Sequence, residues 1–138
     1  MIRKIVVVLL AGVLLSACST NKSKPQDDEK TAEKGSYIKL KPEEAKTMMD
    51  NGEDYLILDV RTPEEYQVSR IRTAYLLPVD ELSKRVELEI PNKDTVIFVY
   101  CRSGNRSRTA TLKLIELGYS RVYDIGGIID WPYDIAND

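Results

Sequence analysis

Short apolar runs alternate with segments of helical spacing along the chain from Tyr37 onward. Runs rich in β-branched and aromatic residues, each bounded by polar or turn residues, predict strands at residues 37–40, 55–60, 74–77, 95–100 and 122–125. Between these runs, apolar residues at helical spacing predict helices that begin at Lys41 and Thr62 and that cover 79–86 and 107–117. Because strands and helices alternate regularly, we expect an α/β fold, a parallel sheet with helices on both faces.

The predicted helix after the second strand carries a clear start signal. Thr62 is suited to the N-cap, Pro63 to the first helical position, and Glu65 to the reciprocal capping contact. The last helix has its stop signal at Gly118, directly after its apolar stripe. These signals fix the ends of two helices more firmly than the apolar spacing does.

Composition limits the classes of function. The chain has 138 residues, 43% hydrophobic and 30% charged, which suits one small globular domain with additional segments. The formal net charge of −2 and the lack of a basic stripe argue against nucleic-acid binding. Histidine is absent, which excludes a histidine base or metal ligand, and two cysteines without a CxxC spacing make a metal site improbable. We expect no cofactor and no metal.

The first residues of the chain have the features of an export signal. Two basic residues precede an apolar stretch, 5–15, which is shorter than the roughly 20 residues of a membrane-spanning helix. The Leu-Ser-Ala-Cys run that ends at Cys18 resembles the cleavage motif of bacterial lipoproteins. We therefore expect residues 1–17 to be a lipoprotein signal peptide and Cys18 to be lipidated. An ordinary signal peptide or a short signal anchor is the alternative.

The segment after Cys18 differs in composition from the domain that follows. Residues 18–36 hold no large apolar side chain, so they predict a flexible tether, and the domain is expected to cover 37–138. Position 19 is Ser rather than Asp, which in a cell with two membranes resembles sorting to the outer membrane. The protein is thus expected to be exported and anchored by lipid, either to the outer membrane facing the periplasm or to the outer face of the plasma membrane.

The strongest candidate for chemistry is the segment where the run 95–100 ends. Cys101 follows that run, and a short loop of small, polar and basic residues then leads into the helix. Inward-facing N–H groups of such a loop, together with a helix N-terminus, favour an anion. They lower the pKa of a thiol from about 8.5 towards roughly 3.5–7.5, and Arg102 and Arg106 add to the effect. The alternative is a buried structural cysteine at the end of a core strand.

This loop resembles the active-site loop of the rhodanese (sulfurtransferase) family, Cys-Arg-x-Gly-x-Arg, through Cys101, Arg102, Gly104 and Arg106. The cysteine phosphatases use a similar loop that is one residue longer, and Ser107 stands where their arginine would be. The larger loop fits a tetrahedral phosphate, and the smaller one fits a sulfur atom carried on cysteine.

Two further segments resemble the same family, and one departs from it. The segments are 58–66, which contains Asp59, Arg61 and the capping motif, and the Gly-Gly-x-x-x-Trp run 126–131. Where the family usually has Gly-His-Ile-Pro-Gly-Ala, this chain has residues 69–74, Ser-Arg-Ile-Arg-Thr-Ala. Asp59 thereby loses its usual partner, and we expect Arg70 to pair with it instead. The alternative is that the arginines of this segment are solvated surface charges.

The resemblance implies sulfur transfer. Cys101 would take a sulfur atom from an anionic donor such as thiosulfate, hold it as a persulfide, and pass it to cyanide, a thiol or a partner protein's cysteine. Binding of the donor would fall to the loop, with Arg61 as a weaker candidate; the loop residues are Arg102, Ser103, Gly104, Asn105 and Arg106. A phosphatase or arsenate reductase, or a binding or redox-sensing module without turnover, are the alternatives. The enzymatic interpretation requires the loop amides to face the sulfur and the sulfur to be open to solvent.

Overall fold

The computed structural model describes residues 35–137, and their centre is a five-stranded sheet with the strand order β1-β6-β5-β2-β4. All neighbouring strands of this sheet are parallel. Its strands are β1 (Ile38–Lys39), β2 (Tyr55–Asp59), β4 (Tyr75–Leu76), β5 (Val96–Cys101) and β6 (Val122–Gly127). The predicted signal peptide, Cys18 and most of the predicted tether lie outside the described residues.

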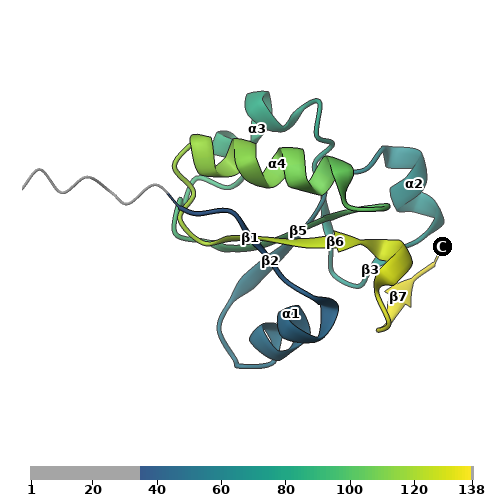
Figure 1. Ribbon diagram of the computed structural model, residues 1–138. Helices are drawn as coiled ribbons and strands as arrows, with labels where there is room; N and C mark the ends of the chain where they lie inside the picture. Colours follow the sequence, from purple (N-terminus) through teal and green to yellow (C-terminus); the bar gives the residue numbers. More distant parts are fainter. Residues whose placement is uncertain (1–34, 138) are drawn as a thin grey trace, which may run out of the picture. The chain divides into compact units, whose positions relative to one another are not determined.

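Helices cover both faces of the sheet, as the alternation of elements predicted (Figure 1). The helix α1 (Pro42–Met49) packs on one face, and α3 (Leu82–Glu89) and α4 (Asn105–Glu116) pack on the other. The short helix α2 (Pro63–Val68) follows the carboxyl end of β2. The fold is therefore α/β with a parallel sheet between two helical layers.

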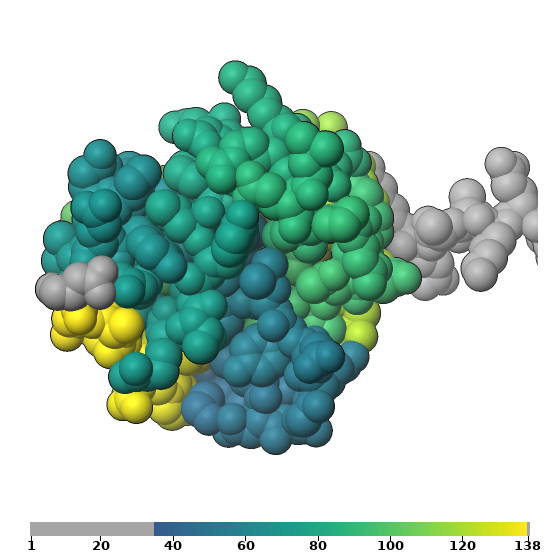
Figure 2. Space-filling model, turned by 180° about the vertical axis from the view of Figure 1, so that it is seen from behind, coloured from purple at the N-terminus to yellow at the C-terminus, as the bar shows by residue number. Residues whose placement is uncertain are grey.

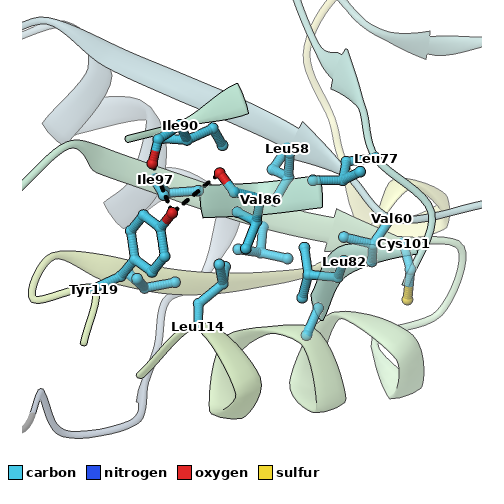
Figure 3. Packing of buried hydrophobic residues seen from close by; sticks show 13 residues of the cluster. Leu58, Val60, Leu77, Leu82, Val86, Ile90, Ile97, Cys101, Leu114 and Tyr119 are labelled. Atoms are coloured by element: carbon cyan, nitrogen blue, oxygen red, sulfur yellow. Dashed lines mark hydrogen bonds between the residues drawn. The ribbon is translucent and has the colours of Figure 1, made fainter. Parts of the chain in front are cut away.

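The central strand β5 is buried along its whole length, which explains its unbroken apolar sequence. Because side chains alternate between the two faces of a strand, Phe98 and Tyr100 join the cluster under α1. Val99 and Cys101 join the cluster under α3 and α4. Figure 3 shows Cys101 at the edge of this second cluster, beside Val60. The strand thus brings the cysteine to the layer in which α4 begins.

The sequence did not predict every element. A small antiparallel ribbon joins β3 (Arg70–Ile71) to β7 (Ile135–Ala136), and a 3₁₀ turn, η1 (Ile128–Asp130), follows β6. Figure 2 shows the C-terminal residues of the ribbon, in yellow, at the surface of the domain. The helix α3 covers Leu82–Glu89 rather than the predicted 79–86. Within residues 35–137, no helix combines the length and apolar character that crossing a bilayer requires.

Candidate active site

The loop between β5 and α4 encloses the thiol of Cys101. The N–H of Gly104 donates a hydrogen bond to Cys101 Sγ at 3.0 Å, so this amide faces the sulfur as predicted. Gly104 has a φ of 103°, in the left-handed region, which lets the chain turn sharply into the first turn of α4. The glycine of the motif is therefore required by the backbone conformation of the loop.

Two opposing effects act on the pKa of Cys101. The residue exposes only 1% of its surface, and burial disfavours a charged thiolate. Backbone hydrogen bonds from Ser107, Gly104 and Ser103 favour the thiolate, and with them the pKa of Cys101 lies below its ordinary value. One requirement of the enzymatic interpretation, inward-facing amides, is met. The other, a sulfur open to solvent, is not met in this conformation, so sulfur transfer at Cys101 requires the residues at the rim of the loop to move before a donor reaches the sulfur.

A buried carboxylate supports the loop from behind. Asp124 on β6 accepts hydrogen bonds from the Ser107 hydroxyl at 2.7 Å and from the Gly126 N–H at 2.9 Å. Its other oxygen accepts a bond from the Tyr37 hydroxyl at 2.6 Å. In the sequence Asp124 is only one residue of the predicted strand 122–125, although a charged side chain inside an apolar run is a signal that its carboxylate has fixed partners.

The end of β6 packs directly against the loop. A Cβ added at Gly127 would lie 2.2 Å from the carbonyl oxygen of Arg102 and 2.6 Å from the Cα of Ser103, so any side chain here would displace the backbone of the loop. The Ile129 N–H also donates to the Arg102 carbonyl, at 3.3 Å. The second glycine of the C-terminal segment is thus explained by its contact with the cysteine loop.

Arg106, predicted to hold the donor, already has a partner. Its guanidinium makes a two-pronged ion pair with Glu65 on α2, with N–O distances of 2.7 and 2.8 Å. Since α2 follows β2 and α4 follows the adjacent β5, the pair joins two segments at the carboxyl ends of these strands, the edge at which parallel sheets bind ligands. The hydrogen bonds to Arg106 hold the pKa of Glu65 at about 2. Glu65 also accepts a bond from the Thr62 N–H, so the predicted capping box is confirmed.

The predicted partner of Asp59 is wrong. Its carboxylate is held by Arg61, with Nε and Nη2 at 2.9 and 2.6 Å, and by the Tyr100 hydroxyl at 2.6 Å, not by Arg70. Arg61 and Asp59 are both buried, and Arg61 Nη2 also donates to the Ser69 carbonyl at 2.6 Å. Arg70 instead lies over the ring of Tyr66, at 4.8 Å from its centre. This geometry favours a structural role for Arg61, which anchors the segment after α2, over the donor-binding role considered for it.

The remaining predicted site residues lie where a ligand can reach them. Arg102, Ser103 and Asn105 are exposed around the rim of the loop. The structure thus brings Cys101 together with the whole predicted loop, while Arg61 is engaged in its buried ion pair with Asp59. No group of three or more side chains able to hold a metal ion occurs within residues 35–137.

Comparison with known families agrees with this geometry. The family model described as rhodanese-like domain matches residues 41–132, from the start of α1 to just past Trp131. The match covers well over half of the chain and contains β2, the cysteine loop and the glycine pair. The chain belongs to the rhodanese-like family.

The relatives of the chain include sulfurtransferases. It is 37% identical over 73 residues to the thiosulfate sulfurtransferase PspE of Escherichia coli (strain K12), covering 53% of this chain and 70% of that protein. It is 45% identical over 80 residues to a sulfurtransferase of Allochromatium vinosum, covering 57% of this chain and 73% of that protein. These relatives support a rhodanese-type enzyme.

Solved structures share the fold. The structure titled rhodanese with anions, from E. coli, matches with a TM-score of 0.58 and 32% identity, over 62% of this chain and all of that one. A rhodanese-like domain protein from Staphylococcus aureus matches with a TM-score of 0.62 and 25% identity, over 73% of this chain and 98% of that one. The parallel sheet and the loop at the end of β5 are therefore those of a rhodanese-like domain.

Proposed function

We propose that this protein is a sulfurtransferase that carries a sulfane sulfur on Cys101, with thiosulfate or a similar anion as donor. The observation that carries the proposal is the 3.0 Å hydrogen bond from the Gly104 N–H to Cys101 Sγ, inside a loop that has the family's motif. Amides that stabilise a thiolate also stabilise the negative outer sulfur of a persulfide. The sulfurtransferase relatives support the same chemistry.

The reaction has two displacement steps. In the first, the Cys101 thiolate attacks the outer sulfur of thiosulfate, the donor's S–S bond breaks, and its electron pair leaves with sulfite. In the second, a nucleophilic acceptor attacks the outer sulfur of the persulfide, and the electron pair of the broken S–S bond returns to Cys101. Neither step needs a proton donor, which is consistent with a chain that lacks histidine. The acceptor is cyanide, a thiol or a partner protein's cysteine.

Two observations favour this function over the alternatives. The position that a phosphatase loop gives to arginine holds Ser107, whose hydroxyl is bonded to the buried Asp124. Cys101 is also the only cysteine within residues 35–137, so this part of the chain holds no second thiol that resolves an oxidised one. A phosphatase and a self-contained redox switch both fit these observations less well.

The mass of the intact protein tests the proposal. Purified full-length protein treated with thiosulfate should gain the mass of one sulfur atom, and cyanide should remove it with release of thiocyanate. Cys101→Ser should show no gain while keeping the circular-dichroism spectrum of the folded domain. Unchanged mass in the wild type, or an equal gain in Cys101→Ser, would refute the mechanism. Turnover of an aryl phosphate without sulfur loading would favour the phosphatase alternative.

We also propose that the protein is exported and lipid-anchored through Cys18. The basic start, the apolar stretch and the Leu-Ser-Ala-Cys run support this placement. Expression of the full chain in a bacterium with labelled fatty acid should label the wild type and not Cys18→Ala. Equal labelling of both, or recovery of both in the soluble fraction, would refute it.

A further inference from the structure

A hollow of about 460 Å³ lies on the face of the sheet that α1 covers, whereas the side chain of Cys101 packs on the opposite face. Its walls come from α1, from β2, from the end of β3 and from the segment 131–134 between η1 and β7. The helix α1 and the β3–β7 ribbon lie on the same side of the sheet (Figure 1). The volume falls within the roughly 300–1,000 Å³ typical of small-molecule sites. The hollow is therefore a candidate binding site that the cysteine loop does not share.

Apolar and aromatic side chains make up most of the lining of this hollow. Met49 on α1, Ile57 on β2 and Ile71 on β3 are buried members of one apolar cluster. Trp131 and Tyr133 line the hollow as well, and their rings meet edge to face with 5.1 Å between their centres. Covering such side chains releases water from apolar surface, which is favourable. The lining therefore favours a ligand that has an apolar body.

Four charged side chains also line the hollow, and two of them neutralise each other. Lys46 and Asp50 form an ion pair of 2.5 Å at the end of α1. The other two are Arg72 and Asp134, which are exposed. Neither of these makes an ion pair or a side-chain hydrogen bond with another residue that the structure describes. One cation and one anion thus remain available to a ligand.

The backbone places these two unpaired charges next to each other. Ile71 and Ile135 are partners in the antiparallel ribbon, and Arg72 and Asp134 are the next residues on the two chains. Side chains at opposing positions of such a ribbon lie close together. A ligand that contacts both must therefore carry an anionic and a cationic group only a few bonds apart.

We propose that this hollow binds a free α-amino acid with a large apolar side chain, such as leucine. The carboxylate of the amino acid contacts the guanidinium of Arg72, a pairing that can be two-pronged, and its ammonium contacts the carboxylate of Asp134. Both groups of an α-amino acid are joined to one carbon atom, which matches opposite charges on neighbouring residues. The apolar side chain of the ligand packs against Met49, Ile57 and Trp131. The site involves no covalent step and does not depend on the chemistry of Cys101.

The chain contains its own reporter for this test. Trp131 is the only tryptophan of the sequence and lines the hollow, so its fluorescence should change when a ligand binds, and titration calorimetry gives a second readout. The full-length protein is titrated with leucine and with three compounds that each lack one feature. These are 4-methylpentanoate without the ammonium, isopentylamine without the carboxylate, and glycine without the apolar body. The variants are Arg72→Gln, Asp134→Asn and the control Lys84→Gln, an exposed lysine on α3 at the other face of the sheet.

The expected results form a pattern across compounds and variants. Leucine should bind the wild type more tightly than the other three compounds, by about two- to fivefold for each exposed charge contact that is missing. Arg72→Gln should weaken the binding of leucine and 4-methylpentanoate by a similar factor but not that of isopentylamine. Asp134→Asn should weaken leucine and isopentylamine but not 4-methylpentanoate. Lys84→Gln should match the wild type with every compound.

The proposal is overturned if leucine changes neither the fluorescence nor the heat signal of the folded wild type, or if it binds all three variants equally. Binding of 4-methylpentanoate as tight as that of leucine would refute the site for a zwitterion and indicate a site for simple carboxylates. Circular dichroism shows whether each variant is folded. Cys101→Ser should bind leucine like the wild type, so a failure of sulfur loading leaves this test intact.

Discussion

Replacing Glu65 with Gln should make the protein a better acceptor of sulfur from thiosulfate. The change removes the negative partner of Arg106 and leaves the guanidinium free to bind an anionic donor. A glutamine still accepts the hydrogen bond from the Thr62 N–H, so the start of α2 is preserved. The substitution therefore separates the ion pair from the capping contact.

The size of the effect follows from the exposure of the pair. The side chains of Arg106 and Glu65 are 34% and 28% exposed, so the pair is screened and contributes about 1 kcal/mol at most. A donor that no longer competes with Glu65 gains up to that amount, which corresponds to a KM for thiosulfate lower by about two- to fivefold. Because the pKa of Glu65 is about 2, the pair is ionised at pH 5 to 8, and acidification in that range does not imitate the mutation.

Steady-state transfer from thiosulfate to cyanide, measured at two ionic strengths, tests this reasoning. The matched control is Glu64→Gln, which removes the same charge from the same turn of α2, and Glu64 makes no ion pair within the described residues. Glu65→Gln should lower the KM well beyond Glu64→Gln, and Arg106→Gln should raise it. An unchanged or higher KM in Glu65→Gln would mean that the ion pair holds the loop in its active form and does not compete with the donor.

Three further predictions concern the turn before β4 and the cysteine loop. Thr73→Gly should raise the melting temperature by about 2–6 °C. Thr73 has a φ of 67°, a conformation that costs about 1–2 kcal/mol and that glycine adopts without strain, although the larger entropy of the unfolded glycine chain offsets part of the gain. Arg72→Gly, at the exposed neighbouring position, should lower the melting temperature. Gly127→Ala should slow alkylation of Cys101 by iodoacetamide and destabilise the domain by about 1–3 kcal/mol in urea titration, because the added methyl overlaps the loop backbone. The alkylation rate of wild-type Cys101 should rise with pH and level off at a midpoint below that of a free cysteine thiol measured under the same conditions, since hydrogen bonds from the loop lower the pKa of Cys101. A midpoint at or above that of the free thiol contradicts this reasoning.

The elements that the sequence predicted well are those with long or chemically distinctive patterns. The strand β5 is an uninterrupted apolar run, and the capping signals at Thr62 and Glu65 specify one local geometry. The two-residue strands of the β3–β7 ribbon carry no periodicity to detect, because their pairing depends on segments more than 60 residues apart. The family resemblance places the chain's segments but does not predict this contact.

The errors in the site concern the hydrogen-bond partners of two carboxylates, which were assigned from the sequence alone. Asp59 and Arg61 are two residues apart, a spacing that places side chains on the same side of an extended chain, yet the prediction gave Asp59 to Arg70. Glu65 was assigned to the helix cap alone, although a carboxylate accepts several hydrogen bonds and has room for Arg106 as well. The second partner of Glu65, Arg106 on α4, can be recognised only once the pairing of β2 with β5 is known.

The enclosure of Cys101 separates the roles of the residues around it. With 1% of its surface exposed, Cys101 is loaded only when the residues around the loop give access to the sulfur, so the first step depends on the contacts that hold those residues in place. In the persulfide the reacting atom lies about 2.05 Å beyond Sγ, one S–S bond further out, and the second step therefore depends on the rim. On this argument Glu65→Gln alters the rate of loading from thiosulfate and leaves the discharge of the loaded protein by cyanide unchanged. A Glu65→Gln variant that altered both steps equally would show that the ion pair with Arg106 controls access to the sulfur in each step.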